Sequence, residues 1–359
     1  MTGEHAALAA AAQALSSEFH RELVAWQRSH GRHHLPWQRT RDPYRVWLSE
    51  IMLQQTQVTT VLGYYERFLA RFPDVAALAA APEDEVFGLW SGLGYYSRAR
   101  NLHRCAQEVV ARFGGRFPHT AAELATLPGI GRSTAAAVAA FCFGERVAIL
   151  DGNVRRVLAR LLAYGGDLAV AANERALWAA ADVLLPPADR PDDIAAYTQG
   201  LMDLGATICL PRRPDCLLCP VQALCRARAG GDVERYPVRS RKLRRTAQTL
   251  WVLLAQREED GAVWLHKRPA RGIWAGLWAL PVFESREALL AACPSAAEPQ
   301  DLPAFVHVLT HKDLHLHPVA TAFASQSPAI EGSWVDADRW PTLGLPAPVR
   351  RLLEQRAAG

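Results

Sequence analysis

Four cysteines lie within a short stretch of the sequence, with the spacing Cys209-x6-Cys216-x2-Cys219-x5-Cys225. Thiolates bind zinc and iron–sulfur clusters, and four of them are enough to close one site. A structural zinc site more often has two tight Cys-x2-Cys pairs, and here only one pair is tight. The spacing therefore leaves zinc and a [4Fe–4S] cluster as equal alternatives, with unliganded buried thiols as a third.

A carboxylate stands where a helix is predicted to begin. Asp151-Gly152-Asn153 follows the apolar run 147–150 and precedes apolar residues at helical spacing. Asp and Asn are good N-caps, which is the simplest explanation of both residues. The helix dipole would also hold the Asp151 carboxylate ionised, so that it could stabilise a developing positive charge or orient a water.

A second carboxylate, Glu50, lies in the predicted helix 43–54, and three of its four neighbours on the helix surface are apolar: Val46, Trp47 and Leu53. Burial on an apolar stripe raises the pKa of a carboxyl group and keeps a proton available near neutral pH. An exposed glutamate at the edge of the stripe fits equally well. If both functional hypotheses hold, the pKa values of the two carboxyls are pushed apart, as in sites that cleave glycosidic bonds.

Several turns have residue types suited to DNA. The glycines of Leu127-Pro128-Gly129-Ile130-Gly131, together with the helix start that follows, can cradle a phosphate. Gln54-Gln55-Thr56 and Gly92-Leu93-Gly94-Tyr95-Tyr96 can wedge into a base stack and fill the space left by a flipped nucleotide. A plain turn between helices and aromatic packing against a neighbouring helix are the alternatives.

The elements that must position these residues are of two kinds. Apolar positions recur at helical spacing over 17–30, 43–54, 58–71, 83–90, 97–113, 120–127, 132–143, 154–164, 174–185 and 192–206. Short β-like runs follow at 249–255, 263–267, 278–282, 305–309 and 314–320, with helices near 285–292 and 347–356. We therefore predict an all-α domain over 1–228, a linker over 229–246 and an α+β domain over 247–359.

The region of the predicted linker is basic. Residues 226–245 contain eight Lys and Arg residues but only two acidic residues, Asp232 and Glu234. A solvated tether and a direct contact with phosphates are equally compatible with that charge.

Composition bounds the class of protein. The 359 residues are 50% hydrophobic and 21% charged, with a net charge of +4, which is typical of a globular chain. No run approaches the ~20 apolar residues of a membrane helix, and no basic segment precedes the alanine stretch 6–14, so we expect neither a membrane partner nor a secretory signal. An odd number of cysteines, seven, argues against a disulfide framework. We expect Cys105, Cys142 and Cys293 to be buried small apolar residues, in a monomeric, cytoplasmic protein.

These motifs occur in an order and at spacings that resemble the MutY family, the adenine DNA glycosylases of the helix-hairpin-helix superfamily, over nearly the whole chain. The segments that carry the resemblance are LSEIMLQQTQV (48–58), GLGYYSRARNLH (92–103), LPGIGRSTAAA (127–137), ILDGNVRRVLAR (149–160), MDLGATIC (202–209), the four cysteines and GIWAGLWALP (272–281). The resemblance implies an all-α helix-hairpin-helix glycosylase domain whose cysteines ligate a [4Fe–4S] cluster, followed by an α+β Nudix-like domain.

The resemblance also implies an activity. The family flips adenine out of double-stranded DNA that contains A·8-oxoguanine or A·G mispairs and hydrolyses its glycosidic bond. Glu50 matches the glutamate that protonates the adenine at N7. Asp151 matches the aspartate that stabilises the oxocarbenium-like sugar, directly or through a covalent intermediate, and Asn153 supports that carboxylate.

Other positions match the parts of the family that hold DNA. Trp37 and Gln199 lie where the family contacts the departing adenine. The positions at the mispair are matched by Gln55, Thr56, Leu93 and Tyr95, and the DNA-binding hairpin by Leu127, Gly129 and Gly131. The resemblance therefore implies that the protein is associated with the nucleoid when it is bound to DNA.

Ser133 distinguishes two reaction types. The bifunctional relatives that resemble endonuclease III carry at this position a lysine whose amine attacks the sugar. This chain has serine at that position, and its sequence contains no lysine before Lys242. We therefore predict a monofunctional glycosylase with weak or no lyase activity.

The C-terminal domain resembles the Nudix-like domain that recognises 8-oxoguanine, but we find no glutamate-rich Nudix box and expect no pyrophosphatase activity. The family usually reads the oxidised base with Phe-Ser-His, for which this chain has Leu309-Thr310-His311. The hydroxyl and the imidazole are kept, whereas the aromatic ring is lost.

Two other functions stay open at this point. One is a glycosylase for mismatched thymine or oxidised pyrimidines, against which the C-terminal domain and Glu50 argue. The other is a non-catalytic iron–sulfur scaffold that binds damaged DNA, which would need neither Glu50 nor Asp151.

Overall fold

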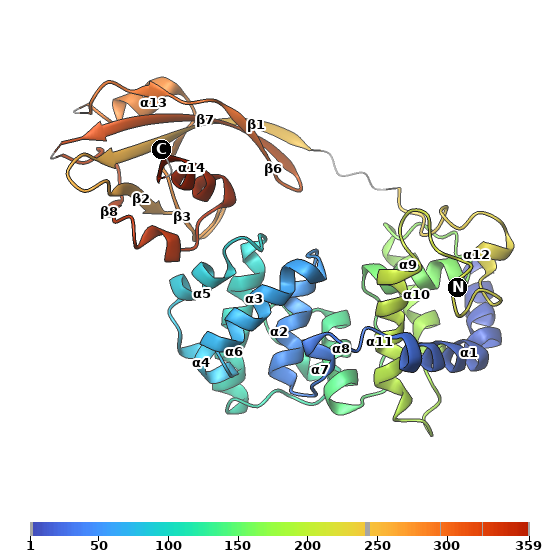
Figure 1. The fold of residues 1–359 in the computed structure, drawn as a ribbon. Helices are drawn as coiled ribbons and strands as arrows, with labels where there is room; N and C mark the ends of the chain where they lie inside the picture. The colour runs from blue at the N-terminus through green and yellow to red at the C-terminus, as the bar shows by residue number, and fades with distance from the viewer. Residues whose placement is uncertain (1–2, 241–244, 295, 325, 358–359) are drawn as a thin grey trace. The chain divides into compact units, whose positions relative to one another are not determined.

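The computed structural model describes residues 3–240, 245–294, 296–324 and 326–357. As predicted, the chain is helical up to residue 229 and contains a sheet after residue 245 (Figure 1). It divides into two compact units, and the first consists of Met1–Gln55 and Cys105–Arg241. The second consists of Thr56–Arg104 and Lys242–Gly359. The predicted domain boundaries at 228 and 247 stay a prediction, because the compact units divide the helical region itself.

The first unit is built from helices, and several of them share a hydrophobic core. Its elements are α1 (Gly3–His30), η1 (Pro36–Gln38), α2 (Pro43–Leu53), the end of α6 (Tyr96–Phe113), α7 (Ala121–Leu124), α8 (Arg132–Phe143), α9 (Gly152–Leu161), α10 (Ala171–Val183), α11 (Asp193–Thr207) and α12 (Arg226–Ala229). The apolar faces of α1, α8, α9, α10 and α11 meet in this core, with Phe19, Ala136, Leu158, Leu177 and Leu201 among its buried residues.

The second unit joins helices to a sheet. The helices before the sheet are α3 (Val58–Arg71), α4 (Val75–Ala80), α5 (Glu83–Trp90) and the start of α6. The later elements are β1 (Thr246–Arg257), β2 (Val263–Lys267), β3 (Trp278–Ala279), β4 (Val282–Phe283), α13 (Arg286–Ala291), β5 (Gln300–Asp301), β6 (Phe305–Val308), β7 (Lys312–Phe323), β8 (Ser333–Val335), η2 (Trp340–Thr342) and α14 (Ala347–Ala357).

The sheet is centred on the two long strands. β1 and β7 pair in parallel from Thr246 opposite Lys312 to Arg257 opposite Phe323. The sheet order is β3-β2-β1-β7-β5, and β4, β6 and β8 pair with β1, β7 and β2. β1 is buried on both faces, because Leu250, Val252 and Leu254 belong to one core and Leu253 and Ala255 to another.

Specific contacts hold the early helices of the second unit to its later elements. The Asp84 carboxylate on α5 accepts hydrogen bonds from Lys267 Nζ at 2.7 Å and from Trp278 Nε1 at 3.2 Å. On the same helix, a Cβ added to Gly88 would lie 2.0 Å from the Thr342 carbonyl oxygen, so only glycine permits this approach. Segment 56–104 therefore packs as part of the unit that contains the sheet.

Several elements differ from the sequence-based expectation. α1 begins at Gly3 instead of near residue 17, because the alanine stretch continues the helix. The predicted strand 278–282 is divided into β3 and β4, with Pro281, which lacks the N–H that a strand ladder needs, between them. α4, β5 and β8 were not predicted, and each is too short for a periodic pattern to reveal.

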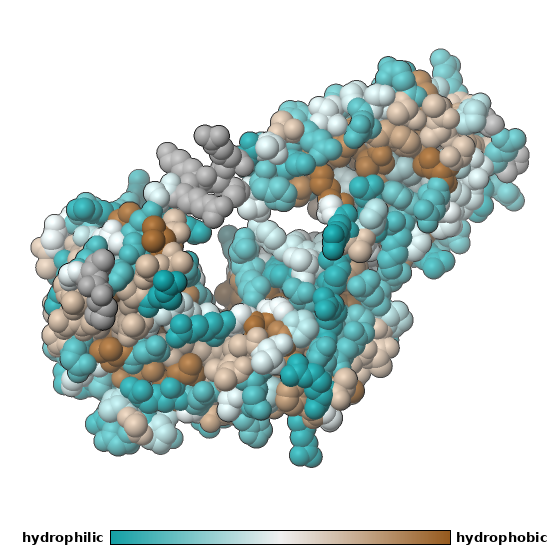
Figure 2. All heavy atoms as spheres, turned by 180° about the vertical axis from the view of Figure 1, so that it is seen from behind, coloured by the Kyte–Doolittle hydropathy of each residue, from teal (hydrophilic) through white to brown (hydrophobic). Residues whose placement is uncertain are grey.

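The predicted linker is mostly docked on the first unit. The Arg160 guanidinium donates to the Tyr236 carbonyl at 3.0 Å, and the Leu168 amide donates to the Val238 carbonyl at 3.0 Å. The basic residues Arg241, Lys242 and Arg244 lie outside the described residues. No helix in the described ranges is long and apolar enough to cross a membrane. On the face in Figure 2, hydrophobic patches alternate with polar residues.

Candidate active site

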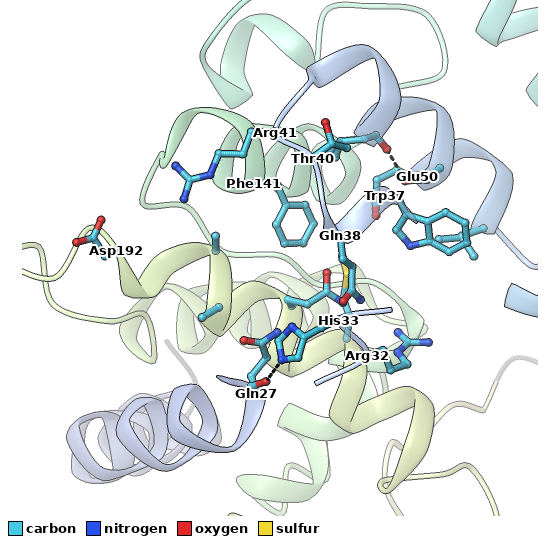
Figure 3. Close-up of a pocket in the computed structure, with 17 residues that line it drawn as sticks. Gln27, Arg32, His33, Trp37, Gln38, Thr40, Arg41, Glu50, Phe141 and Asp192 are labelled. Carbon is cyan, nitrogen blue, oxygen red and sulfur yellow. Dashed lines mark hydrogen bonds between the residues drawn. The ribbon is translucent and has the colours of Figure 1, made fainter. Parts of the chain in front are cut away.

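Glu50 lies at a cavity of about 290 Å³ in the first unit (Figure 3). Helix α2 carries it, and Asp42 caps this helix by accepting a hydrogen bond from the Tyr44 amide at 2.9 Å. The helix buries Val46 and Trp47, so that Glu50 is half-buried beside them, as the apolar stripe predicted.

The cavity also contains both residues expected to contact a base. Trp37 from η1 and Gln199 from α11 line its wall. Figure 3 shows the Phe141 ring of α8 and the Trp37 indole on the same cavity, with the Gln38 amide nearby. Phe141 was not singled out from the sequence, because an apolar residue on a predicted helix gives no sign that it faces a cavity.

Burial has a large effect on the protonation of Glu50. Desolvation of the charged form raises the pKa of Glu50 from 4.5 to about 8, and repulsion from the nearby Asp151 carboxylate adds to the increase. The Glu50 carboxyl group is therefore mainly protonated at neutral pH and can donate a proton to a molecule in the cavity.

Asp151 caps helix α9, as predicted, and its Oδ1 accepts a hydrogen bond from the Val154 amide at 2.7 Å. The expected pKa of this carboxyl group needs correction. Burial raises the pKa of Asp151, although hydrogen bonds from the Val154 and Asn153 amides and the nearby Arg156 guanidinium act in the opposite direction. The pKa values of Glu50 and Asp151 are therefore both raised. The N-cap position predicted the hydrogen bonds of Asp151 but not its burial.

Asn153 is fixed against α11. The Arg156 guanidinium donates to Asn153 Oδ1 at 2.8 Å, to the Gly205 carbonyl at 2.6 Å and to the Cys209 carbonyl at 2.7 Å. A Cβ on Gly205 would lie 2.7 Å from Asn153 Cβ. Helices α9 and α11 thus meet where only glycine fits, and Arg156 joins them to the first cysteine.

Ser133 lies in the first turn of α8, and its Oγ accepts a hydrogen bond from the Leu150 amide at 3.1 Å. The hydroxyl therefore holds the backbone immediately before Asp151. Asp151, Asn153 and Ser133 do not line the cavity that contains Glu50.

The predicted hairpin joins α7 to α8. Gly129 has φ +76°, which favours glycine, and the Ile130 amide donates to the Leu127 carbonyl at 3.2 Å. Leu127 and Ile130 are buried and anchor the turn, whereas Gly129 and Gly131 are exposed. No side chain caps α8, so its first amides can donate to an anion.

The predicted mispair residues occupy strained turns. Gln55 and Tyr95 have φ values of +56° and +48°, and both are exposed. In the second unit, Tyr95 OH lies 3.1 Å from Thr310 Oγ1, in the turn between β6 and β7 where His311 is also exposed. Leu93 differs from the expectation of a wedge, because its side chain is buried.

Arg98 binds the two turn segments together inside the second unit. Its Nη2 donates to Thr56 Oγ1 at 3.2 Å and to the Leu93 carbonyl at 3.1 Å, and its guanidinium lies 5.5 Å from the centre of the Tyr95 ring. This arginine was missed from the sequence, since a charged residue in a helix usually faces solvent.

The four clustered cysteines line one small cavity, together with Arg160 and Arg228. The Arg160 guanidinium donates to Cys209 Sγ at 3.3 Å and to the Leu210 carbonyl at 2.6 Å. Within the described ranges, no three or more His, Cys, Asp or Glu side chains are arranged to hold a single metal ion. Of the isolated cysteines, Cys105 is buried as expected, whereas Cys142 and Cys293 are half-buried.

Comparison with known proteins identifies two domain families in the chain. Residues 48–181 match the model of the HhH-GPD superfamily of base excision DNA repair proteins, and residues 251–355 match the NUDIX domain. The chain is 34% identical to the adenine DNA glycosylase of Buchnera aphidicola subsp. Baizongia pistaciae over 93% of its length and 95% of the relative's. It is 37% identical to the adenine DNA glycosylase of Homo sapiens, over 86% of this chain and 68% of that one.

Two solved structures resemble the helical part. A thermostable thymine-DNA glycosylase is 31% identical, with a TM-score of 0.53, and the match covers 60% of this chain and 97% of that one. Endonuclease III in a non-covalent complex with DNA is 22% identical, with a TM-score of 0.50 and coverage of 61% and 97%. The second likeness concerns the fold alone.

Proposed function

Since this chain belongs to the adenine DNA glycosylase family, a family of N-glycosylases that bind DNA and act in base excision repair, we propose that its substrate is adenine paired with 8-oxoguanine or guanine. The observation that carries the proposal is Glu50, a carboxyl group with a pKa of about 8 on the wall of a cavity lined by Trp37 and Gln199. A flipped adenine in this cavity would lie beside a proton donor.

The two carboxyl groups would act in sequence. Glu50 donates its proton to N7 of the purine, which makes adenine a better leaving group. As the glycosidic bond breaks, positive charge develops on the sugar, and the ionised Asp151 stabilises it before water completes the hydrolysis. Arg156 holds Asn153 against α11. Asn153 would thereby keep the start of α9, and with it Asp151, in position next to the charged sugar.

We assign recognition of the opposite base to the second unit. Tyr95 and Thr310 belong to distant parts of the sequence but lie within hydrogen-bond distance, and both are exposed. An aromatic ring can enter the base stack while a hydroxyl group meets the edge of 8-oxoguanine. Arg98 would hold this turn in place before DNA binds.

Ser133 supports a monofunctional reaction. Its hydroxyl group is occupied by the Leu150 amide, and the sequence has no lysine in the helical region to attack the sugar as an amine. Borohydride should therefore trap no covalent complex with substrate DNA, and a trapped complex would contradict this assignment.

The four cysteines would hold a [4Fe–4S] cluster. All four line one cavity, and Arg160 directs its positive charge toward Cys209 Sγ, which suits the negative charge of a thiolate-bound cluster. Arg160 on α9 would then connect this loop to the helix that Asp151 caps. Iron and sulfide analysis with a visible absorption spectrum tests this assignment, because zinc gives neither signal.

The direct test of function is single-turnover base release from duplexes with A·8-oxoG, A·G, G·T and A·T pairs. We expect adenine release from A·8-oxoG and from A·G, and none from A·T. Asp151→Asn should bind the A·8-oxoG duplex but lose excision. No adenine release from A·8-oxoG would refute the proposal, and thymine release from G·T would favour the activity named for the thymine-DNA glycosylase that the helical part resembles.

A further inference from the structure

A buried carboxylate stands directly behind the wall of the cavity. Asp203 lies on α11, four residues after Gln199, and its side chain is only 1% exposed. It does not line the cavity, but three residues that do line it direct hydrogen bonds to it: Arg32, Gln38 and Gln199. Any effect of Asp203 on a bound base must therefore pass through these neighbours.

The contacts of Asp203 are specific. Oδ1 accepts hydrogen bonds from Gln199 Nε2 at 2.8 Å and from Arg32 Nε at 2.7 Å, with Gln38 Nε2 farther away at 3.5 Å. Oδ2 accepts one from the Arg32 backbone amide at 3.0 Å. The Arg32 guanidinium compensates the buried charge, so that the carboxylate can serve as a fixed acceptor.

A carboxylate can only accept hydrogen bonds, and this fixes the orientation of the Gln199 amide. Its NH2 group must point toward Asp203, since the reversed amide would place two oxygens against each other. The Gln199 oxygen then points away from Asp203, and among the described residues it has no hydrogen-bond donor. Gln199 therefore offers the cavity an acceptor.

An acceptor in this place distinguishes bases by one group. Adenine carries a donor, the N6 amino group, whereas guanine and thymine carry the oxygens O6 and O4 at the corresponding edge. A site built to accept a hydrogen bond binds the amino base, and a keto base would set two acceptors face to face. Gln38 also lines this cavity, and its Nε2 is directed toward the same Asp203 oxygen at 3.5 Å.

We propose that Asp203 is the positioning residue that fixes the Gln199 amide with its oxygen toward the cavity, and so selects 6-amino over 6-keto purines. The inference rests on the proposed function, because it requires that the cavity receive the flipped base. It assigns Asp203 no contact with substrate.

The test compares release of adenine and of hypoxanthine, its 6-keto analogue, from otherwise identical duplexes opposite 8-oxoguanine. In Asp203→Asn, the side-chain amide can donate as well as accept, so Gln199 is free to reverse. We expect the ratio of the adenine rate to the hypoxanthine rate to fall about tenfold or more. An unchanged ratio in folded Asp203→Asn would overturn the proposal.

Two further variants separate positioning from stability. Asp193 is a second buried acid on α11, paired with Arg28 at 2.7 Å and absent from the cavity wall, so Asp193→Asn should lower the melting temperature without changing the ratio. Gln199→Met keeps the side chain's length but removes the amide, so it should lower the ratio as Asp203→Asn does. If Asp203→Asn does not fold, a Gln199→Met enzyme that keeps the wild-type ratio overturns the inference.

The double variant completes the argument. If Asp203 acts through Gln199, adding Asp203→Asn to Gln199→Met should leave the ratio where Gln199→Met set it, whereas independent effects would multiply. Failure of the proposed function gives a different result, because the wild-type protein would then release no adenine from A·8-oxoG.

Discussion

The burial of Glu50 determines the pKa of its carboxyl group and, through it, the expected pH dependence of the reaction. The apolar stripe of α2 partly buries Glu50, and desolvation of the carboxyl group raises its pKa to about 8. Because Glu50 must be protonated to act as the proposed acid, kcat/KM should fall as the pH rises through about 8. On the acid side it should fall at a pH above the ordinary range of an aspartate, since burial also raises the pKa of Asp151. Single-turnover rates at subsaturating enzyme across pH 4–10 measure the decrease on the acid side and on the alkaline side. A flat profile around pH 8 would exclude Glu50 as the acid.

The same burial should lower stability. The Glu50 carboxyl has its ordinary pKa of 4.5 when unfolded and about 8 when folded, so the folded state loses stability relative to a neutral side chain as the pH rises from 4.5 to 8. Glu50→Gln should therefore abolish excision but be more stable than wild type at pH 8, by roughly 1–3 kcal/mol once the effect is reduced for the exposed part of the Glu50 side chain. Thermal unfolding at pH 8 and near pH 4.5 checks this, because the difference should disappear at the lower pH.

What the sequence revealed at this scale depended on local patterns. The helical spacing around Glu50 and the capping position of Asp151 are visible in consecutive residues, and both agree with the structure. The burial of Asp151 and the place of Asp203 depend on which helices pack together, which local spacing does not contain. Asp203 nevertheless left a signal, because it follows Gln199 by four residues and so shares its face of α11.

At the scale of elements, Arg98 joins the turn 92–95 to Thr56. Arg98→Met should release the strained backbone of Tyr95 and weaken binding of the A·8-oxoG duplex by about tenfold, with a smaller effect on the rate of the bound complex. Titration of a duplex carrying an uncleavable adenine analogue measures the binding. Arg104→Met, an exposed position on the same helix, is the control. Equal binding by the two variants would mean that Arg98 does not position the turn.

The close approach of α9 and α11 gives a second test. Gly205→Ala places a methyl group 2.7 Å from Asn153 Cβ, so α9 must shift with Asp151. We expect a loss of stability of about 1–3 kcal/mol and a lower excision rate. Gly63→Ala in α3 meets nothing within 4 Å, and should stabilise the protein by roughly 0.5–1 kcal/mol. Matched melting curves compare the two, and a stabilised Gly205→Ala would contradict the packing.

Element types followed from the sequence better than element boundaries did. Strong periodicity located helices such as 58–71 and 132–143 to the residue, because their apolar faces repeat over three or more turns. Two-residue strands such as β4 and β5 have no period, and they form because β1 and β7 offer them a partner.

At the scale of the whole chain, segment 56–104 groups with 242–359. A chain that ends at residue 241 should therefore lose hydrogen-exchange protection in α5, whose partners near Thr342 and Lys267 are gone, and in α3, which packs against α5. Protection in α8 and α9 should stay close to that of the full chain. Exchange measured by mass spectrometry on both chains decides the matter, and unchanged protection over 58–90 would contradict this division.

The sequence suggested a boundary between domains at the change from helical to β-like texture. The secondary-structure pattern of a sequence does not show which segments pack together. The grouping of 56–104 with the sheet could therefore not be predicted from it. The glycine at position 88 and the carboxylate of Asp84 make that packing possible, and each looks ordinary in a helix.

The hydrogen bond from the Leu150 amide to Ser133 Oγ has an evolutionary consequence. A lysine at position 133 would supply a nucleophilic amine but no hydroxyl acceptor, so the amide next to Asp151 would lose its partner, at a cost of about 1–3 kcal/mol. On the proposed mechanism, a change from hydrolysis to strand cleavage through Ser133→Lys would therefore cost stability unless another acceptor for the Leu150 amide were present. The backbone as well as the side chain would then separate the two chemistries.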